Sequence, residues 1–383
     1  MSILLRGDIL TLMNVATAST WLEIDLSAIR NNVKILLERA GVPLMAVVKA
    51  NGYGHGIVET SQAALQGGAS WLGVARLEEA QLLRAAGIYC PVLVLGYTHA
   101  ERAAEAAAAA VTLTVYDPQL ARDLSAQAAP LGVQIPIHAK FDTGMGRLGV
   151  FPEEGVDFIR LLRSLPGLQL TGMFTHFARA DDWEHATTTT QLKRFQTLLI
   201  ALKAAGLRPQ IVHASNSAAT LYLPEARFDL CRAGIAIYGL NPSAETPLTA
   251  GFRAALTWKA RLTSVKVLPA GHGVGYNHRY FTQKDERIGV VSVGYADGLR
   301  RRLGNFALVG GIRVPMVGGV CMDQVMLNLD GVPAAKIGDE VVLIGRQGDV
   351  VITAEEVATA WGTVNYDVVC GLEARVVRFY LEN

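Results

Sequence analysis

The sequence predicts an α/β barrel followed by a mostly antiparallel β domain, and three observations support this prediction. Between about residues 44 and 239, eight short apolar runs rich in β-branched residues alternate with longer stretches of helical pattern. Such alternation is typical of repeated strand–helix units around a parallel sheet. After about residue 245 the pattern changes to short strands separated by Gly, Pro and Asp. The length of 383 residues also suits two domains.

The eight predicted barrel strands follow one another along the first domain. They are LMAVVKA from Leu44, WLGVA from Trp71, VLVLG around Leu93, VTLTV from Val111, IPIHAKFD from Ile135, LTGMFTHF from Leu170, IVHASN from Ile211 and FDLCRAGIAIYG from Phe228. Between them, residues 76–86 and 191–205 carry apolar side chains at helical spacing, and each stretch is followed by a glycine that can end a helix. Eight strands with helices between them predict a closed (β/α)8 barrel, and its crossovers are expected to be right-handed.

The predicted second domain begins near residue 245, within the turn-rich sequence GLNPSAETPLTA. We divide the chain into a flexible extension at 1–20, a barrel domain at 21–245 and a β domain at 246–383. The β domain is expected to form a small antiparallel sandwich or barrel from LTWKARLTSVKVL, RIGVVSV, VPMVGGVC, QVMLNL and EVVLIG, with one short helix at 353–361. The strand WLEIDL at 21–26 lies outside the eight and is a candidate to pair with the β domain.

Composition excludes several classes of protein. With 51% hydrophobic and 18% charged residues the chain is globular, and a net charge of +1 offers no field that would attract nucleic acid or a lipid surface. The four cysteines, Cys90, Cys231, Cys321 and Cys370, lack metal-ligand spacing and suit isolated thiols in a reducing, cytoplasmic compartment. The apolar patch at residues 9–13 is too short for a signal peptide, and Met13 is a candidate initiator.

The first candidate for chemistry is Lys49, which ends the first barrel strand in AVVKANGYGHG. Reactive groups of such barrels lie at the carboxyl ends of the strands, and a desolvated lysine there can form a Schiff base with a bound aldehyde. The alternative is a lysine whose ammonium simply extends into solvent. At the ends of strands seven and eight, Ser217 and the amides of Gly234 and Ile235, beside Arg232, can cradle a phosphate.

Two further motifs lie at the same predicted rim. KFDTGMGRLG at 140–149 ends the fifth strand and places Arg147 where it can bind a carboxylate or a phenolate. THFA ends the sixth strand and places His176 there, although a hydrogen-bonded core histidine is an equally good interpretation.

Nine motifs together resemble those of bacterial alanine racemases. They are VVKANGYGHG, DTGMGRLG, THFA, SNSAAT, RAGIAIYG, GVGYNHRY, GYADG, GGVCMDQ and NYDV, in the family's order, and the resemblance covers residues 21–380. It implies pyridoxal 5'-phosphate (PLP) as cofactor, interconversion of L-alanine and D-alanine, and a place in D-alanine supply for the cell wall.

The resemblance also implies a role for each catalytic residue. Lys49 would hold PLP and act as the base for the D-isomer, whereas Tyr276 would act on the L-isomer. Racemisation needs two bases on opposite faces, because a proton taken from one face must return to the other. A tyrosine is a poor base unless its phenolate is stabilised, and His176 and Arg232 would form that relay. Arg232 would also keep the pyridine nitrogen unprotonated, which suppresses transamination.

The remaining implied residues bind the cofactor or the substrate. The phosphate group would be held by Tyr53, Ser217, Gly234, Ile235 and, from the second domain, Tyr366. Arg147 would contact the cofactor phenolate and the substrate carboxylate, and Tyr295, Met322 and Asp323 would complete the substrate pocket. In the family the pocket residues of the second domain come from the neighbouring protomer, so a head-to-tail homodimer is expected.

Lys140 matches a position that the family often carbamylates, and the alternative is a lysine paired with Asp142. Three competing functions stay open at this point. PLP-dependent decarboxylases of basic amino acids share the architecture, but the tyrosine of GVGYNHRY and the arginine of RAGIAIYG favour a racemase. A PLP carrier protein would resemble only the first domain, and a serine or broad-specificity racemase would more often carry a signal peptide and a disulfide.

Overall fold

The computed structural model describes residues 15–182 and 185–382. Most of the predicted N-terminal extension, with Met13, therefore lies outside the described residues. Contacts divide the chain into two compact units. The barrel unit is Ala28–Arg253, and the β unit combines the residues up to Ser27 with those from Ala254 onward.

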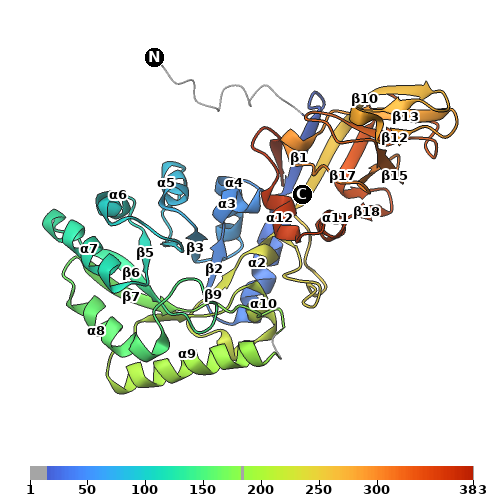
Figure 1. Cartoon of the computed structure of the whole chain (residues 1–383). Helices are drawn as coiled ribbons and strands as arrows, with labels where there is room; N and C mark the ends of the chain where they lie inside the picture. Colours follow the sequence, from blue (N-terminus) through green and yellow to red (C-terminus); the bar gives the residue numbers. More distant parts are fainter. Residues whose placement is uncertain (1–14, 183–184, 383) are drawn as a thin grey trace, which may run out of the picture. The chain divides into compact units, whose positions relative to one another are not determined.

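The barrel unit contains one parallel sheet of eight strands, all of which the sequence predicted. They are β2 (Leu44–Val47), β3 (Trp71–Val74), β4 (Val92–Val94), β5 (Thr112–Val115), β6 (Ile135–Lys140), β7 (Leu168–Phe174), β8 (Ile211–His213) and β9 (Cys231–Ala233). From β2 to β8 each strand pairs with the next along the chain, and β9 pairs with β2 (Figure 1). Between β8 and β9, the amides of Asp229 and Arg232 donate to the carbonyls of Val212 and Ser215 at 2.9 and 3.2 Å, and these bonds complete the barrel.

Helix α2 (Leu26–Ala40) precedes the first barrel strand, and the other helices connect the strands of the barrel. They are α3 (Lys49–Tyr53), α4 (Ile57–Gln66), α5 (Leu77–Ala85), α6 (Ala103–Ala108), α7 (Pro118–Ala128), α8 (Gly155–Ser164), α9 (Ala186–Ala204) and α10 (Ser217–Tyr222). The helices predicted at 76–86 and 191–205 are α5 and α9. Helix α9 begins earlier than predicted because its first turn is a run of threonines with no apolar periodicity, and the His185 side chain caps it by accepting from Thr187 N.

The β unit is built on a closed ring of six antiparallel strands. These are β10 (Leu256–Leu268), β13 (Glu286–Val291), β16 (Val325–Asn328), β15 (Ile312–Val317), β14 (Phe306–Val309) and β17 (Glu340–Gln347), and β17 pairs back with β10. The WLEIDL run lies in β1 (Thr20–Asp25), which joins β10 antiparallel and β19 (Val377–Leu381) parallel. Strand β18 (Val350–Ile352) extends β17, and β11 (Gly273–Val274) pairs with β12 (Tyr280–Phe281).

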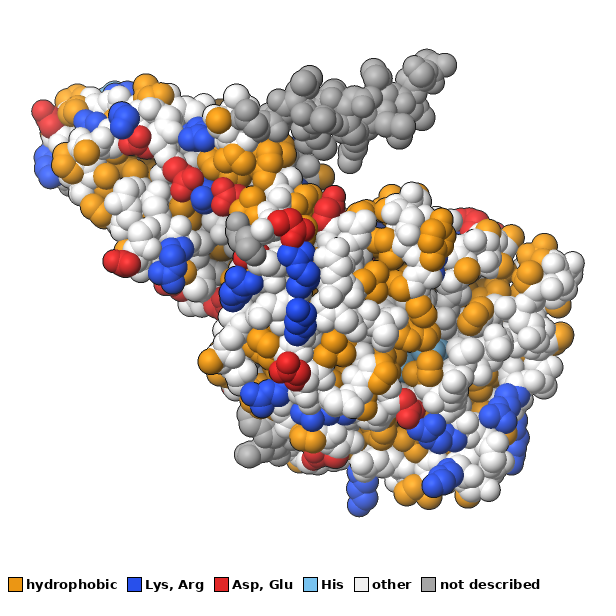
Figure 2. All heavy atoms as spheres, turned by 180° about the vertical axis from the view of Figure 1, so that it is seen from behind, with side chains coloured by type: hydrophobic (Ala, Val, Ile, Leu, Met, Phe, Trp, Pro, Cys, Tyr) orange, Lys and Arg blue, Asp and Glu red, His pale blue; other side chains and the backbone are white. Residues whose placement is uncertain are grey.

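Two α-helices of the β unit lie near its carboxyl end. The predicted helix at 353–361 is α11 (Ala354–Trp361), whose capping box joins Thr353 and Glu356. Helix α12 (Asn365–Cys370) was not predicted, because six residues with one apolar pair give no helical period. Among the described residues, no helix combines the length and apolar character of a membrane span. On the face drawn in Figure 2, basic and acidic side chains are interspersed, in keeping with a net charge of +1.

Candidate active site

Lys49 lies at the carboxyl end of β2, at the start of an unusual turn. The residues that follow it, Ala50, Asn51 and Gly52, have φ of 54°, 53° and 61°, so α3 is a left-handed turn and not a right-handed helix. This conformation is unfavourable for residues with a Cβ and persists only where the surroundings impose it. The Asn51 side chain accepts from Ile57 N at 3.0 Å and so ties the turn to α4. The turn fixes both Lys49 and Tyr53, which ends it, at the barrel rim.

Arg232 lies in β9 and is only 3% exposed. Its guanidinium donates to the carbonyls of Thr175 and Ala214 at 2.9 and 2.8 Å. The same group lies 2.8 Å from His213 Nδ1 and 3.2 Å from His176 Nδ1. Because a guanidinium can only donate, both imidazoles must accept through Nδ1 and carry their proton on Nε2. Burial, reinforced by repulsion from Arg232, holds the pKa of both histidines well below 6.5, so both are neutral.

The hydrogen-bond chain continues from His213 to His138. His213 Nε2 lies 2.8 Å from His138 Nδ1, so the proton on His213 is donated to a second neutral imidazole. Burial and then the charge of Arg232 lower the pKa of His138 to about 3. No motif of the sequence indicates a role for His138 or His213. Each is an isolated histidine inside a barrel strand, and only the folded sheet shows that they share a chain that leads to Arg232.

Lys140 ends β6 and is 5% exposed, with its ammonium 5.4 Å from the centre of the Phe174 ring. Burial lowers its pKa to about 8, and the charges of Arg147, Arg232 and, more weakly, Lys49 contribute to the decrease. Because the charges of Arg147, Arg232 and Lys49 all affect the pKa of Lys140, these four cationic groups lie near one another at one rim of the barrel.

The loop after β6 is organised by Asp142. Its Oδ1 accepts from the amides of Gly144, Met145 and Gly146 at 2.9, 2.8 and 3.2 Å, and its Oδ2 accepts from Arg147 N at 3.1 Å. Burial alone would raise the pKa of Asp142, but these four bonds outweigh it and the pKa is lowered. The charge of Asp142 raises the pKa of Lys140, but this effect is smaller than the opposing effects of burial, Arg147 and Arg232. Arg147 itself is exposed and lines a cleft of about 830 Å³ formed by the loops after β4, β5 and β6.

Three hydrogen-bond donors converge where a phosphate cradle was predicted. Gly234 N donates to Ser217 Oγ at 2.9 Å, and Ile235 begins the 3-10 turn that follows β9. A Cβ at position 234 would overlap the Tyr53 hydroxyl, so that hydroxyl reaches the backbone at this point. The Tyr53 and Ser217 hydroxyls and the Gly234 amide are suitable donors for a phosphate dianion, so the residues present fit the phosphate end of PLP.

The other predicted residues belong to the β unit. Tyr276 begins a 3-10 turn (Tyr276–His278) and is 71% exposed, and Met322 is 53% exposed. Tyr276, Met322 and Asp323 line the same hollow of about 590 Å³. Tyr366 lies half-buried in α12. The structure therefore groups the predicted residues into one set on the barrel unit and a second set on the β unit.

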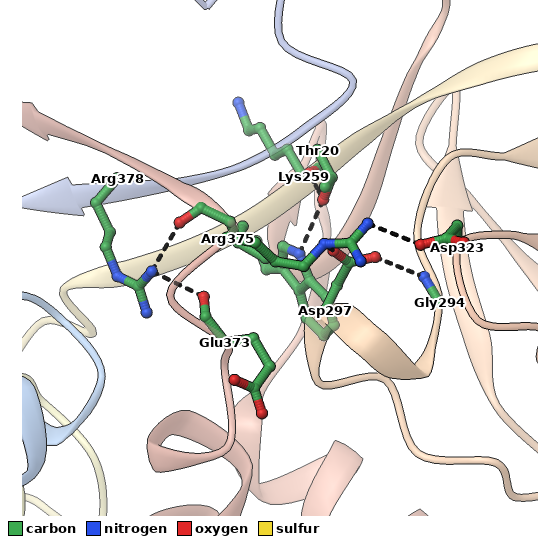
Figure 3. Close-up of polar contacts among 10 residues, drawn as sticks. Thr20, Lys259, Gly294, Asp297, Asp323, Glu373, Arg375 and Arg378 are labelled. Carbon is green, nitrogen blue, oxygen red and sulfur yellow. Dashed lines mark hydrogen bonds and ion pairs between the residues drawn. The ribbon is translucent and has the colours of Figure 1, made fainter. Parts of the chain in front are cut away.

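The motifs GYADG and GGVCMDQ are joined by backbone hydrogen bonds, and Figure 3 labels Asp297 of the first motif and Asp323 of the second. The amides of Tyr295 and Ala296 both donate at 3.0 Å, to the carbonyls of Cys321 and Met322. Any side chain at Gly294 would overlap those two carbonyl oxygens, so glycine is required there.

Arg375 connects the same two motifs through their carboxylates. Its Nε lies 2.9 Å from Asp297 Oδ1, and a terminal nitrogen lies 2.8 Å from Asp323 Oδ1 (Figure 3). Asp297 also accepts from Gly294 N at 2.8 Å. Arg375 lies in none of the nine motifs and was not predicted, because only the fold shows that it neutralises the buried Asp297 carboxylate.

Comparison with known proteins agrees with this geometry. Residues 24–242 match the N-terminal domain of alanine racemase, and residues 255–380 match its C-terminal domain. The chain belongs to the alanine racemase family. The alanine racemase of Desulfovibrio desulfuricans is 45% identical over 366 residues, which cover 94% of this chain and 98% of that one. Alanine racemase 1 of Bacillus subtilis is 45% identical over 370 residues, which cover 95% and 93% of the two chains.

Solved structures of alanine racemases share the fold. The enzyme from a D-cycloserine-producing Streptomyces lavendulae superposes with a TM-score of 0.91 at 39% identity, over 96% of this chain and 98% of that one. The Bacillus anthracis enzyme with bound L-Ala-P gives a TM-score of 0.90 at 41% identity, over 95% of each chain. The family inferred from the nine motifs is confirmed, and so is the fold class inferred from the pattern of strands and helices.

Proposed function

We propose that this chain interconverts L-alanine and D-alanine with PLP held at Lys49. Alanine racemases are isomerases that use PLP, and the observation that supports the proposal here is the grouping of Lys49, Tyr53, Arg232 and Gly234 at one barrel rim. When bound, PLP stabilises negative charge at the α-carbon of an attached amino acid. Its phosphate group would be held by Tyr53, Ser217, Gly234, Ile235 and, from the β unit, Tyr366.

Arg232 is suited to face the ring nitrogen of PLP. Even with its pKa lowered to about 10 by burial, Arg232 stays charged at neutral pH and cannot readily give a proton to that nitrogen. His213 accepts from the guanidinium and fixes its orientation. An unprotonated ring nitrogen would withdraw fewer electrons from the α-carbon. Return of the proton to the α-carbon would therefore be favoured over transamination.

Two bases serve the two faces of the substrate. Lys49 accepts the α-proton of D-alanine, and Tyr276 of the partner subunit accepts the α-proton of L-alanine. In each direction, the other of these two groups then donates a proton to the opposite face of the α-carbon. The tautomer of His176 allows this histidine to stabilise the phenolate of Tyr276. Because its Nδ1 accepts from Arg232, its Nε2 carries a proton that can be donated to a phenolate oxygen.

The remaining site groups bind the carboxylate and complete the pocket. Arg147 would bind the substrate carboxylate and the cofactor phenolate. Lys140, with a pKa of about 8, has a neutral fraction near physiological pH whose amine can attack carbon dioxide and release a proton, and the resulting carbamate would pair with Arg147. Tyr295, Met322 and Asp323 of the partner subunit would close the pocket in a head-to-tail homodimer. We place this enzyme in the cytoplasm, where it would supply D-alanine for the cell wall.

A chiral product assay tests the proposal. The purified protein is incubated with PLP and L-alanine, L-serine or L-lysine in separate reactions, and the D-isomers are measured while the visible absorbance band of bound PLP is recorded. We expect rapid formation of D-alanine that the Lys49→Ala substitution abolishes. Faster turnover of serine would instead indicate a serine racemase, carbon dioxide release from lysine would indicate a decarboxylase, and the lack of any PLP band would contradict the mechanism.

A further inference from the structure

Glu79 joins the ends of two neighbouring barrel strands. It is the third residue of α5 and is half-buried. Its Oε2 accepts from the amides of Ala75 and Arg76, which follow β3, at 2.7 and 3.2 Å. Its Oε1 accepts from the amide of Ala50 at 2.6 Å. Ala50 immediately follows Lys49 at the end of β2, so a single carboxylate connects the residue after the proposed cofactor lysine to the next strand of the barrel.

The contact with Ala50 is not explained by helix capping. In a capping box, the residue at the third helical position accepts from the N-cap amide, and the Oε2 bond to Arg76 already fulfils that role for α5. The Oε1 bond reaches a different element and adds nothing to α5. A hydrogen bond from a backbone amide to a carboxylate is one of the stronger kinds of hydrogen bond.

The position of the contact matters because of the backbone it holds. Ala50 is the first residue of the left-handed turn, and its φ of 54° is unfavourable for a residue with a Cβ. A charged acceptor aimed at its amide stabilises that conformation from outside the turn. We infer that Glu79 is a positioning residue for Lys49, and that it holds the left-handed turn so that the lysine side chain leaves the strand in the direction needed to hold PLP. This inference rests on the proposed role of Lys49.

The neighbouring residue provides a matched control. Glu78 lies in the same turn of α5 and carries the same charge, but its carboxylate pairs with Arg102 on the surface, and its side chain is 59% exposed. The Glu78→Gln substitution therefore removes a carboxylate from the same helix turn without touching Ala50.

Two substitutions of Glu79 separate positioning from capping. Glu79→Asp keeps the charge at the start of α5, where it can still cap the helix, but the shorter side chain withdraws from Ala50. Glu79→Gln keeps the length but loses the charge and one acceptor. If capping were the only role, Glu79→Asp would behave like the wild type, and Glu79→Gln would lower only the melting temperature.

The experiment titrates the full-length variants with PLP and follows the visible absorbance band, its pH midpoint, the melting temperature and kcat. We expect both Glu79 variants to bind PLP about tenfold more weakly, to shift the pH midpoint of the band and to lower kcat about 10- to 100-fold, since a displacement near 1 Å has effects of this size. Glu78→Gln should match the wild type.

Wild-type PLP affinity, band and kcat in both Glu79 variants would overturn the inference. Lys49→Ala distinguishes this failure from that of the proposed function. If Lys49→Ala loses the wild-type band while the Glu79 variants behave like the wild type, only the role of Glu79 is wrong. If Lys49→Ala keeps the wild-type band, the proposed role of Lys49 is wrong as well.

Discussion

The two units expose their predicted site residues to very different degrees. On the barrel unit, Arg232 and Lys140 are buried, and Arg232 donates to two carbonyls and two histidines. On the β unit, Tyr276 and Met322 are exposed and line an open hollow. Arg232, whose charge stays fixed in our proposal, therefore has a buried setting with four hydrogen-bond partners. Groups that must approach a substrate from a second face need access, and in our proposal a second copy of the chain covers them.

The largest expected effect tests the barrel side of this comparison. Lys49→Ala should lower racemase activity by at least about 10⁴-fold, because it removes both the cofactor attachment and one base. The visible PLP band should disappear as well. Lys34→Ala, on the exposed face of α2, is the control and should retain both properties. Residual activity within tenfold of the wild type would mean that another group performs the chemistry.

The second prediction tests whether the β unit acts on another copy. Tyr276→Phe should keep the PLP band but lower activity about 10²- to 10⁴-fold. Subunits of Tyr276→Phe and Lys49→Ala, mixed and re-associated, should recover about a quarter of wild-type activity. This is expected because half of the dimers would be mixed and each mixed dimer would carry one intact site. A mixture no more active than its two components would show that each site is contained in one chain.

The third prediction concerns the buried cation of the barrel. Lys140 has a folded pKa of about 8 against an ordinary value of 10.5, so the unfolded chain binds more protons between these pH values. Stability should therefore rise as the pH increases from about 8 to 10.5, by up to about 3 kcal/mol, and the gain is lost as the pH falls back through 8. Urea unfolding in carbon dioxide-free buffer, compared with Lys140→Met, measures this gain. Equal pH dependence of the two proteins would contradict it.

The smallest expected effect concerns the ion pairs that Arg375 forms with Asp297 and Asp323 in the β unit. Arg375→Ala leaves the buried Asp297 carboxylate without its cation, and because Arg375 is half-exposed we expect a loss of about 1–2 kcal/mol. The KM for alanine should rise a few-fold, while the PLP band stays unchanged. Arg313→Ala removes an exposed pair with Glu356 and should cost less than about 0.5 kcal/mol. Equal effects of the two substitutions would show that Arg375 is an ordinary surface residue.

The sequence predicted the parts of this protein that depend on local pattern. Eight β-branched runs were sufficient to locate eight strands, and the motifs that follow these runs placed Lys49, Arg147 and His176 at the barrel rim. The sequence could not reveal partners set by long-range pairing. His138 and His213 share a chain only because β6 and β8 both flank β7, and Glu79 reaches Ala50 only because β2 and β3 are adjacent. Short elements such as α12 were missed because they contain too few apolar residues for a period.

The pairing of β2 with β9 has a consequence for biosynthesis. Leu44 pairs with Cys231, so the strand that ends at Lys49 gains its second neighbour only when the last barrel strand has been made. Contacts this distant in sequence form late and slow the folding of a chain. A nascent chain emerging from the ribosome therefore carries the lysine long before it carries Arg232 and the phosphate cradle. In our proposal PLP is therefore captured only after translation of the whole barrel, so truncated chains should not compete for it.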